Sequence, residues 1–206
     1  MPTVRPFMPS PRGAKLAQAT TPKKQEASLA LGETRYNEGR ELVSEFMDTQ
    51  TGVFHEEAFR HLLTREAGRA TRYQDFFSVC LLRPDVAEDR HQIEEIERAI
   101  SQKIPEFVRA TDLVGQLSSA IAIILLHTAG TDAVRVADRI RASLEQVAFR
   151  EGPEGRPQRL TVSVGKVSFP SDGHTDSILL TQALAYLEQA IERGGNQVTH
   201  SSGSPG

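Results

Sequence analysis

The sequence predicts an α/β fold in which helices pack on a mixed sheet. Short apolar runs of strand length, such as FFSVCLL at 76–82, alternate with longer stretches whose apolar residues recur at helical spacing. Two further apolar segments, 113–117 and 120–126, are separated only by two serines, which predicts a hairpin. Helices between most strands, together with one hairpin, imply a mixed sheet.

In the first half of the chain, helices are expected over 25–47 and 55–72, with DTQTG at 48–52 as the turn between them. The strand at 76–82 is expected to end at Pro84. A third helix over 88–108 carries one apolar stripe, formed by Ile93, Ile96, Ile100, Ile104 and Phe107. Pro105 is expected to kink the last turn of this helix, because proline lacks the backbone N–H.

In the second half, the hairpin is followed by a helix over 132–147, whose apolar face is Ala133, Val136, Ile140, Leu144 and Val147. A loop rich in glycine and proline is expected at 151–157. The alternating segment 160–169 predicts a strand, 176–193 a last helix and 196–199 a short edge strand.

The two ends of the chain are expected to be disordered tails. Residues 1–24 hold five prolines and five basic residues but no acidic one, so they bury too little apolar surface to offset the entropy of ordering. Residues 200–206 are mostly serine and glycine. The N-terminal tail could instead be a basic arm that contacts a partner.

Composition narrows the class of protein. The net charge of −3 gives no general attraction to nucleic acid or to anionic membranes, and no apolar run approaches the roughly 20 residues of a membrane span. The single cysteine, Cys80, lies in an apolar run, so we expect a core residue in a reducing, cytoplasmic compartment. The six histidines show no metal-ligand spacing, and neither a metal nor a cofactor is expected.

Four segments in the right order resemble the GGDEF domain of diguanylate cyclases. They are DTQTGVF at 48–54, the RATD of Arg109 to Asp112, LTVSVG at 160–165 and AIERGGN at 190–196. The resemblance covers roughly 45–199 and assigns 48–199 to a GGDEF domain. It implies a GGDEF-type sheet, mixed but mostly antiparallel, flanked by helices as in nucleotide cyclases and polymerase palms.

The same resemblance locates the catalytic positions of the family, and the residues there differ. The GGDEF turn corresponds to SSAIA at 118–122, and Arg83 stands where a metal-binding carboxylate is expected. The stretch 86–91 has no counterpart of the guanine-binding residues, and Ile191 and Gly195 replace two phosphate-binding cations. Because Mg²⁺ needs hard carboxylate oxygens, we expect a degenerate domain that is not an enzyme and holds no metal.

The resemblance also implies a binding site for cyclic di-GMP, the product of the family's reaction. Its residues here are Arg109, Asp112, Arg135, Arg139 and Arg69, the last corresponding to an arginine that a neighbouring domain contributes. Arginine suits the O6 and N7 acceptors of guanine and the phosphates, and a carboxylate suits the N1–H and N2–H₂ donors. Taken singly, each arginine could instead be a solvated surface residue.

We therefore expect a cyclic di-GMP receptor or effector that signals through contacts with an unidentified protein partner. A ligand-bridged homodimer is possible, with Arg69 of one chain meeting Arg109 and Asp112 of another. The alternative is an interaction scaffold that keeps the GGDEF fold but binds no nucleotide.

Overall fold

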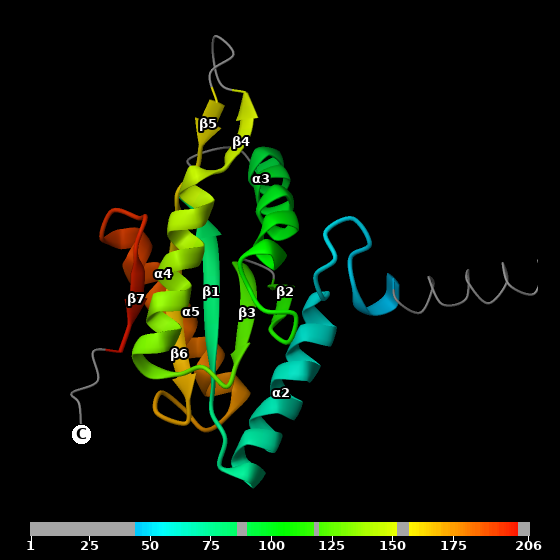
Figure 1. Ribbon diagram of the computed structural model, residues 1–206, viewed down its shortest axis with the longest axis vertical. Helices are drawn as coiled ribbons and strands as arrows, with labels where there is room; N and C mark the ends of the chain where they lie inside the picture. The colour runs from blue at the N-terminus through cyan, green and yellow to red at the C-terminus, as the bar shows by residue number, and fades with distance from the viewer. Residues whose placement is uncertain (1–43, 86–89, 118–119, 152–156, 202–206) are drawn as a thin grey trace, which may run out of the picture. The chain divides into compact units, whose positions relative to one another are not determined.

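Five strands form the central sheet, in the order β2-β3-β1-β6-β7 (Figure 1). Their bounds are β1 Phe77–Pro84, β2 Leu113–Leu117, β3 Ala120–Leu126, β6 Val162–Phe169 and β7 Val198–His200. The first four pair antiparallel, and only β6 and β7 run parallel. The predicted mixed, mostly antiparallel sheet is confirmed.

The computed structural model describes residues 44–85, 90–117, 120–151 and 157–201. The chain divides into two units, Met1–Arg40 and Glu41–Gly206, and every described residue belongs to the second. The expected tail at 1–24 therefore lies outside the described residues, as does most of the helix expected over 25–47, of which 44–46 are helical. Of the tail expected at 200–206, only the first two residues are described.

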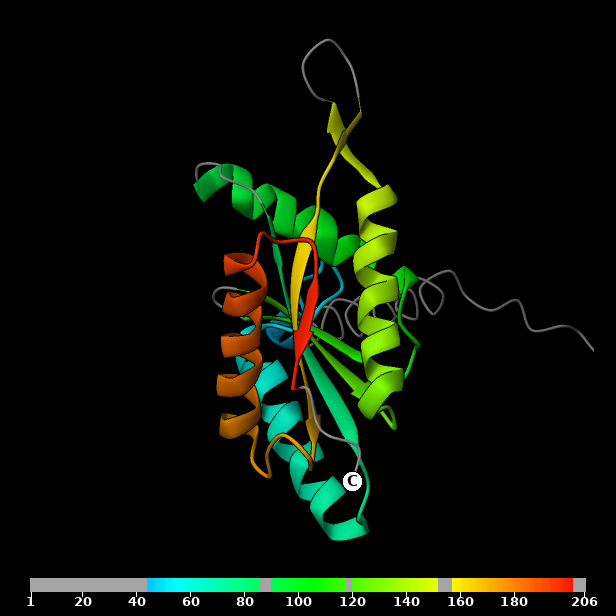
Figure 2. The same ribbon diagram turned by 90° about the vertical axis from the view of Figure 1, so that its left-hand side faces the viewer.

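Helices cover both faces of the sheet (Figure 2). On one face lie α3, Arg90–Lys103, and α4, Gly130–Gln146, whose apolar residues share a core with the inward side chains of β1, β3 and β6. On the other face lie α2, Glu56–Tyr73, and α5, Asp176–Glu192, which close a second core. Because β1 and β6 have a helical layer on each side, nearly all their residues are buried, including Cys80 as predicted.

The contact between α5 and β6 depends on Gly165. A Cβ atom placed there would overlap the backbone of α5 at Ala183 and Leu187. Only a residue without a side chain allows the helix to approach the strand so closely. The glycine of LTVSVG is therefore explained by packing.

Two parts of the predicted element order differ from the structure. The helix expected over 88–108 ends at Lys103 and continues as the 3-10 turn η1, Ile104–Glu106, because Pro105 cannot donate to the α-helical ladder. The loop expected at 151–157 is framed by a short antiparallel ladder of β4, Ala148–Glu151, and β5, Pro157–Arg159. Their sequences, AFRE and PQR, are too short to show a strand period.

Across the described ranges, no helix is both long and apolar enough to cross a bilayer.

Candidate functional site

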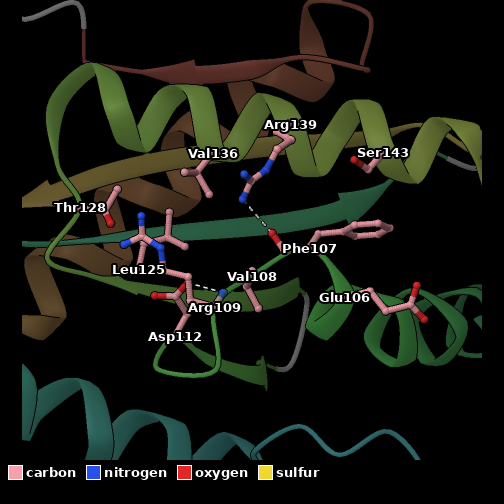
Figure 3. Close-up of a pocket in the computed structure, with 10 residues that line it drawn as sticks. All are labelled: Glu106, Phe107, Val108, Arg109, Asp112, Leu125, Thr128, Val136, Arg139 and Ser143. Carbon is pink, nitrogen blue, oxygen red and sulfur yellow. Dashed lines mark hydrogen bonds between the residues drawn. The ribbon is translucent and has the colours of Figure 1, made fainter.

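A hollow of about 410 Å³ lies between the turn that precedes β2, the end of β3 and one face of α4 (Figure 3). We call it the Arg109 pocket. Its lining is Glu106, Phe107, Val108, Arg109, Asp112, Leu125, Thr128, Val136, Arg139 and Ser143. Three of the five predicted ligand-binding residues line this pocket, namely Arg109, Asp112 and Arg139.

Asp112 organises the turn that carries Arg109. Its Oδ2 accepts a hydrogen bond from the backbone N–H of Arg109 at 2.9 Å, and its Oδ1 accepts one from the backbone N–H of Leu126 at 3.2 Å. The carboxylate thus joins the turn to the end of β3. A carboxylate has about four lone-pair positions, so these two bonds leave acceptor capacity for a ligand.

The Arg109 side chain is exposed, and within the described part of the chain no acidic group pairs with its guanidinium. Arg139 reaches across from α4, and its Nη2 donates to the carbonyl oxygen of Phe107 at 3.0 Å (Figure 3). A guanidinium has five N–H donors, so most of those on Arg139 are not used by this bond. Glu106, the other acid of the lining, lies 2.9 Å from Lys103 Nζ. Two arginines and one carboxylate are thereby presented to the same hollow.

Arg135, unlike Arg139 on the same helix, does not line the Arg109 pocket. The side of α4 that faces the pocket is marked by Val136, Arg139 and Ser143. Arg135 lies further round the helix, where its side chain is 79% exposed and pairs with Asp132 at 3.2 Å. A spacing of four residues places Arg135 and Arg139 near each other on the helix, but only Arg139 reaches the Arg109 pocket.

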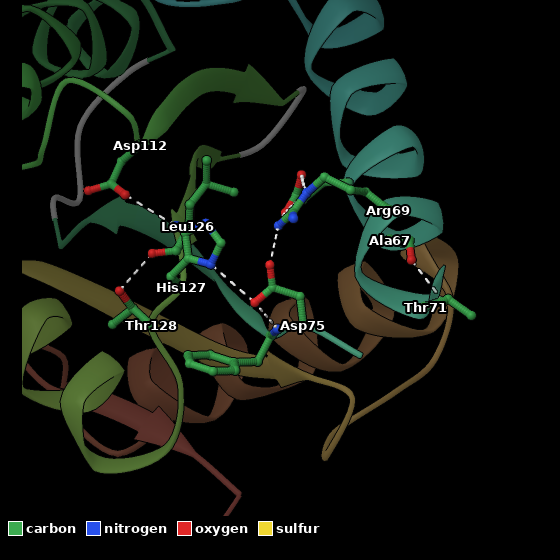
Figure 4. Close-up of polar contacts among 10 residues, drawn as sticks. Ala67, Arg69, Thr71, Asp75, Asp112, Leu126, His127 and Thr128 are labelled. Atoms are coloured by element: carbon green, nitrogen blue, oxygen red, sulfur yellow. Dashed lines mark hydrogen bonds and ion pairs between the residues drawn. The ribbon is translucent and has the colours of Figure 1, made fainter. Parts of the chain in front are cut away.

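Arg69 also lies outside the Arg109 pocket. It belongs to α2, and its Nη2 contacts Glu66 Oε1 on the same helix at 2.6 Å. The same atom contacts Asp75 Oδ2, beyond the end of α2, at 2.7 Å (Figure 4). These two carboxylates raise the pKa of the Arg69 guanidinium above its ordinary value. Arg69 lines a separate hollow on α2, together with Arg65, Arg72, Tyr73, Leu113 and others. A role for Arg69 in a second copy of the chain stays a prediction.

Sequence reasoning gave no ligand-related role to the connection after β3. Thr128 lines the Arg109 pocket, and the backbone of Leu126 holds Asp112. His127 lies between them, directly after the end of β3, and its Nδ1 is 3.1 Å from Asp75 Oδ1 (Figure 4). Asp75 is far away in the sequence, so no motif linked it to this site.

The positions of the family's catalytic residues are described only in part. Ser118, Ser119 and the stretch 86–89 lie outside the described residues, whereas Ala120 and Ile121 are buried in β3. Arg83 lies near the end of β1, with its Nη2 2.9 Å from Glu188 Oε1 of α5.

Gly195 and Asp85 meet at the connection between α5 and β7. Gly195 has φ +75°, and a Cβ there would lie 2.8 Å from Cγ of Asp85. The Asp85 carboxylate accepts hydrogen bonds from Ser163 Oγ at 2.6 Å and from the backbone N–H of Asn196 at 2.7 Å. The substitution of glycine for an arginine at this position is thus matched by local packing.

The described side chains do not form a site that fits the Mg²⁺ ions of a cyclase. In the ranges that the structure covers, no three His, Cys, Asp or Glu side chains are grouped to hold a metal. The Arg83 guanidinium, where the resemblance places a metal carboxylate, would repel a cation.

Comparison with known proteins identifies the family. The family model described as "Diguanylate cyclase, GGDEF domain" matches residues 91–197, which is more than half of the chain. A comparison with curated proteins finds no match.

Solved structures of GGDEF domains share the fold. The coiled coil and GGDEF domain of DgcB from Caulobacter crescentus, in complex with c-di-GMP, has a TM-score of 0.72 at 16% identity; the match covers 89% of this chain and 100% of that one. The GGDEF domain of PA1120 (TpbB or YfiN) from Pseudomonas aeruginosa has 0.65 at 21%, covering 76% and 94%. Diguanylate cyclase SiaD with its activator SiaC, also from Pseudomonas aeruginosa, has 0.67 at 20%, covering 87% and 72%.

The family match contradicts the expectation that the chain is not an enzyme and confirms the resemblance to GGDEF domains. The matching family is that of the diguanylate cyclases. The expectation that the chain is not an enzyme rested on replaced catalytic residues and on the missing guanine-binding stretch, whereas the family model matches residues 91–197. The sequence match over residues 91–197 and the shared sheet agree, and the chain belongs to the GGDEF family.

Proposed function

We propose that this GGDEF-domain protein binds cyclic di-GMP in the Arg109 pocket and works as a receptor or effector. The observation that carries the proposal is that Arg109, Asp112 and Arg139, from a turn and a helix far apart in sequence, line one hollow. Its volume of about 410 Å³ lies within the range of small-molecule sites.

The chemistry of the pocket suits one guanine base with its adjoining phosphate. Arg109 can donate two parallel hydrogen bonds to O6 and N7 of guanine. Asp112, fixed by two backbone N–H groups, can accept from N1–H and N2–H₂ with its remaining lone pairs. Arg139 can donate to a phosphate oxygen while it keeps its bond to the Phe107 carbonyl. The DgcB structures, which contain c-di-GMP, support this ligand class.

Signalling by this receptor proceeds through protein contacts. Cyclic di-GMP has two guanine bases, so a ligand held by one chain can present its other half to Arg69 of a second chain. A contact that exists only in the bound state couples ligand binding to association. The SiaD structure, solved with its activator SiaC, supports the wider idea that a diguanylate cyclase can bind a protein partner.

Calorimetric titration of the full chain with cyclic di-GMP tests the proposal, with a matched pair of variants on α4. Arg139→Ala removes a pocket arginine and is expected to weaken binding about tenfold or more, because a charge-assisted hydrogen bond is lost. Arg135→Ala removes the arginine one turn earlier, outside the pocket, and is expected to change affinity less than about twofold. Arg109→Ala is expected to weaken binding at least as much as Arg139→Ala.

Two results would overturn the proposal. One is the absence of heat at ligand concentrations of about 100 μM, which would exclude a Kd in the micromolar range or tighter. The other is an Arg109→Ala variant that binds as tightly as the wild-type chain. Either result would favour the alternative of an interaction scaffold that binds no nucleotide. A mass measurement with and without ligand, repeated with Arg69→Ala, tests the ligand-bridged dimer.

A second candidate function, synthesis of cyclic di-GMP from GTP, is favoured by the family match itself. Incubation of the full chain with GTP and Mg²⁺ or Mn²⁺, followed by chromatography with mass detection, measures it. Product formed in proportion to protein concentration would support this function. No product under these conditions would leave ligand binding as the supported function.

A further inference from the structure

The connection from β3 to α4 forms one wall of the Arg109 pocket and is held at several points. The backbone N–H of Leu126 donates to Asp112 Oδ1 at 3.2 Å, and the carbonyl of Thr128 accepts from Ser78 Oγ at 2.7 Å. Between them, His127 has φ +47°, in the left-handed region that a residue with a Cβ rarely adopts. Such a conformation persists only where its surroundings hold it.

The His127 side chain supplies one of these holding contacts, from outside the pocket. Its Nδ1 lies 3.1 Å from Oδ1 of Asp75, which belongs to the connection between α2 and β1. The imidazole is 60% exposed, whereas the Asp75 side chain is only 16% exposed. The exposed histidine is therefore paired with a carboxylate that is largely shielded from solvent.

Asp75 is anchored by three groups at once. Its Oδ1 also accepts from the backbone N–H of Phe76 at 2.8 Å, and its Oδ2 accepts from Arg69 Nη2 at 2.7 Å. The Phe76 amide, Arg69 and His127 lower the pKa of Asp75 to about 2, so the carboxylate is ionised at any pH used for a binding assay. Arg69 is thus linked through Asp75 to the His127 side chain (Figure 4). His127 is bonded directly to Leu126, whose backbone N–H donates to Asp112.

We propose that His127 and Asp75 are positioning residues for the Arg109 pocket. Their hydrogen bond holds the connection after β3 in the conformation in which Leu126 fixes the Asp112 carboxylate for the ligand. It also joins Arg69 to the same connection. The inference rests on the proposed binding of cyclic di-GMP, since it concerns the same pocket. Neither residue lines the pocket, so each acts through Asp112 and Thr128.

The chemistry of asparagine offers a rescue that separates this role from general stability. Asparagine carries its side-chain nitrogen at the place that Nδ1 occupies in histidine, and it tolerates a left-handed backbone better than most residues. His127→Asn therefore keeps the donor to Asp75, whereas His127→Ala removes it. His61→Ala is the matched control, because His61 is an exposed histidine on α2 that lines a different hollow.

Titration of the full chain with cyclic di-GMP, together with amide hydrogen exchange at Leu126, tests the proposal. We expect His127→Ala to weaken binding about fivefold to tenfold and to speed exchange at Leu126, because a hydrogen bond to an ionised acceptor is lost. His127→Asn is expected to stay within about twofold of the wild-type affinity with slow exchange restored. Asp75→Asn, which alters the same bond from the other side, should weaken binding, and His61→Ala should not.

The outcomes separate this inference from the proposed function. If Arg109→Ala weakens binding but His127→Ala does not, the positioning role is overturned and the pocket stands. The role is also overturned if His127→Asn binds as weakly as His127→Ala, or if exchange at Leu126 is the same in all variants. If the wild-type chain gives no heat with cyclic di-GMP, both the pocket and its positioning residues are refuted. Exchange measured without ligand tests the role of His127 even where a variant binds nothing.

Discussion

Replacement of Gly165 by alanine is the sharpest test of the packing that positions the sheet. An alanine Cβ would lie 3.0 Å from Cα of Leu187 and closer still to the Ala183 carbonyl oxygen. Two carbon atoms rest at about 3.5–4.0 Å, so α5 would have to move away from β6 by roughly 1 Å. Backbone atoms of a helix cannot turn aside as a side chain can.

The cost follows from what α5 buries against the sheet. Its inward residues are Leu179, Ala183, Leu187 and Ala190, all fully buried. A gap of 0.5–1 Å forfeits about a quarter to a half of each dispersion contact, and overpacking itself costs about 1–3 kcal/mol. We expect Gly165→Ala to lower the free energy of unfolding by about 3 kcal/mol, which for a domain of this size is a fall of roughly 6–12 °C in Tm.

Gly68 provides a control of opposite sign. It is exposed in the middle of α2, and a Cβ there would meet nothing within 4 Å. Alanine at this position removes the entropic cost of glycine in a helix, so Gly68→Ala should stabilise the fold by about 0.5–1 kcal/mol. Thermal unfolding followed by circular dichroism, with urea titration as a second measure, compares the two. A Gly165→Ala variant as stable as wild type would refute the close packing of α5 on β6.

Three further predictions concern single polar contacts. The contribution of Asp75 to stability is present above its unfolded pKa and is lost as the pH falls from about 4 to about 2, because the folded pKa is depressed. In thermal scans, the difference in stability between the wild type and Asp75→Asn should therefore shrink over that pH range. Thr175 caps α5 by accepting from the backbone N–H of Ile178 at 3.3 Å, so Thr175→Ala should cost about 1 kcal/mol in urea unfolding. Arg141 is 16% exposed and donates to Asn196 Oδ1 at 2.6 Å and to the carboxylates of Asp138 and Glu145. Arg141→Ala should therefore lower the free energy of unfolding by about 2 kcal/mol. A decrease below about 0.5 kcal/mol would contradict the anchoring role of Arg141.

Local patterns in the sequence were enough to locate most of the elements that frame the pocket. The apolar runs of β1 and β3 are continuous because both strands are covered on both faces, and a continuous run is visible without any tertiary information. The bounds of β2 and β3 match the predicted hairpin segments. The end of α3 was misplaced, because the apolar stripe continues through η1 although Pro105 has already ended the α-helix.

The resemblance to the GGDEF family identified three residues that line the pocket, Arg109, Asp112 and Arg139. Arg109 and Asp112 lie three residues apart and share one turn, so a motif identifies both. Arg135 and Arg139 are equivalent in sequence pattern, yet only Arg139 reaches the pocket, because the choice depends on how α4 is rotated on the sheet. The expectation that the chain is not an enzyme rested on replaced catalytic residues, whereas the diguanylate cyclase family model matches residues 91–197.

By itself, then, the sequence determined the α/β class, the strands of the core and the motif of Arg109 and Asp112. The class and the strands follow from the side-chain period of short segments, and the motif follows from its resemblance to the GGDEF family. Only the tertiary structure decided that Arg139 and not Arg135 lines the pocket, and that Asp75, His127 and Leu126 connect Arg69 to Asp112. The physical reason is that these contacts join residues from different elements, and their distances are set by how helices and strands pack together.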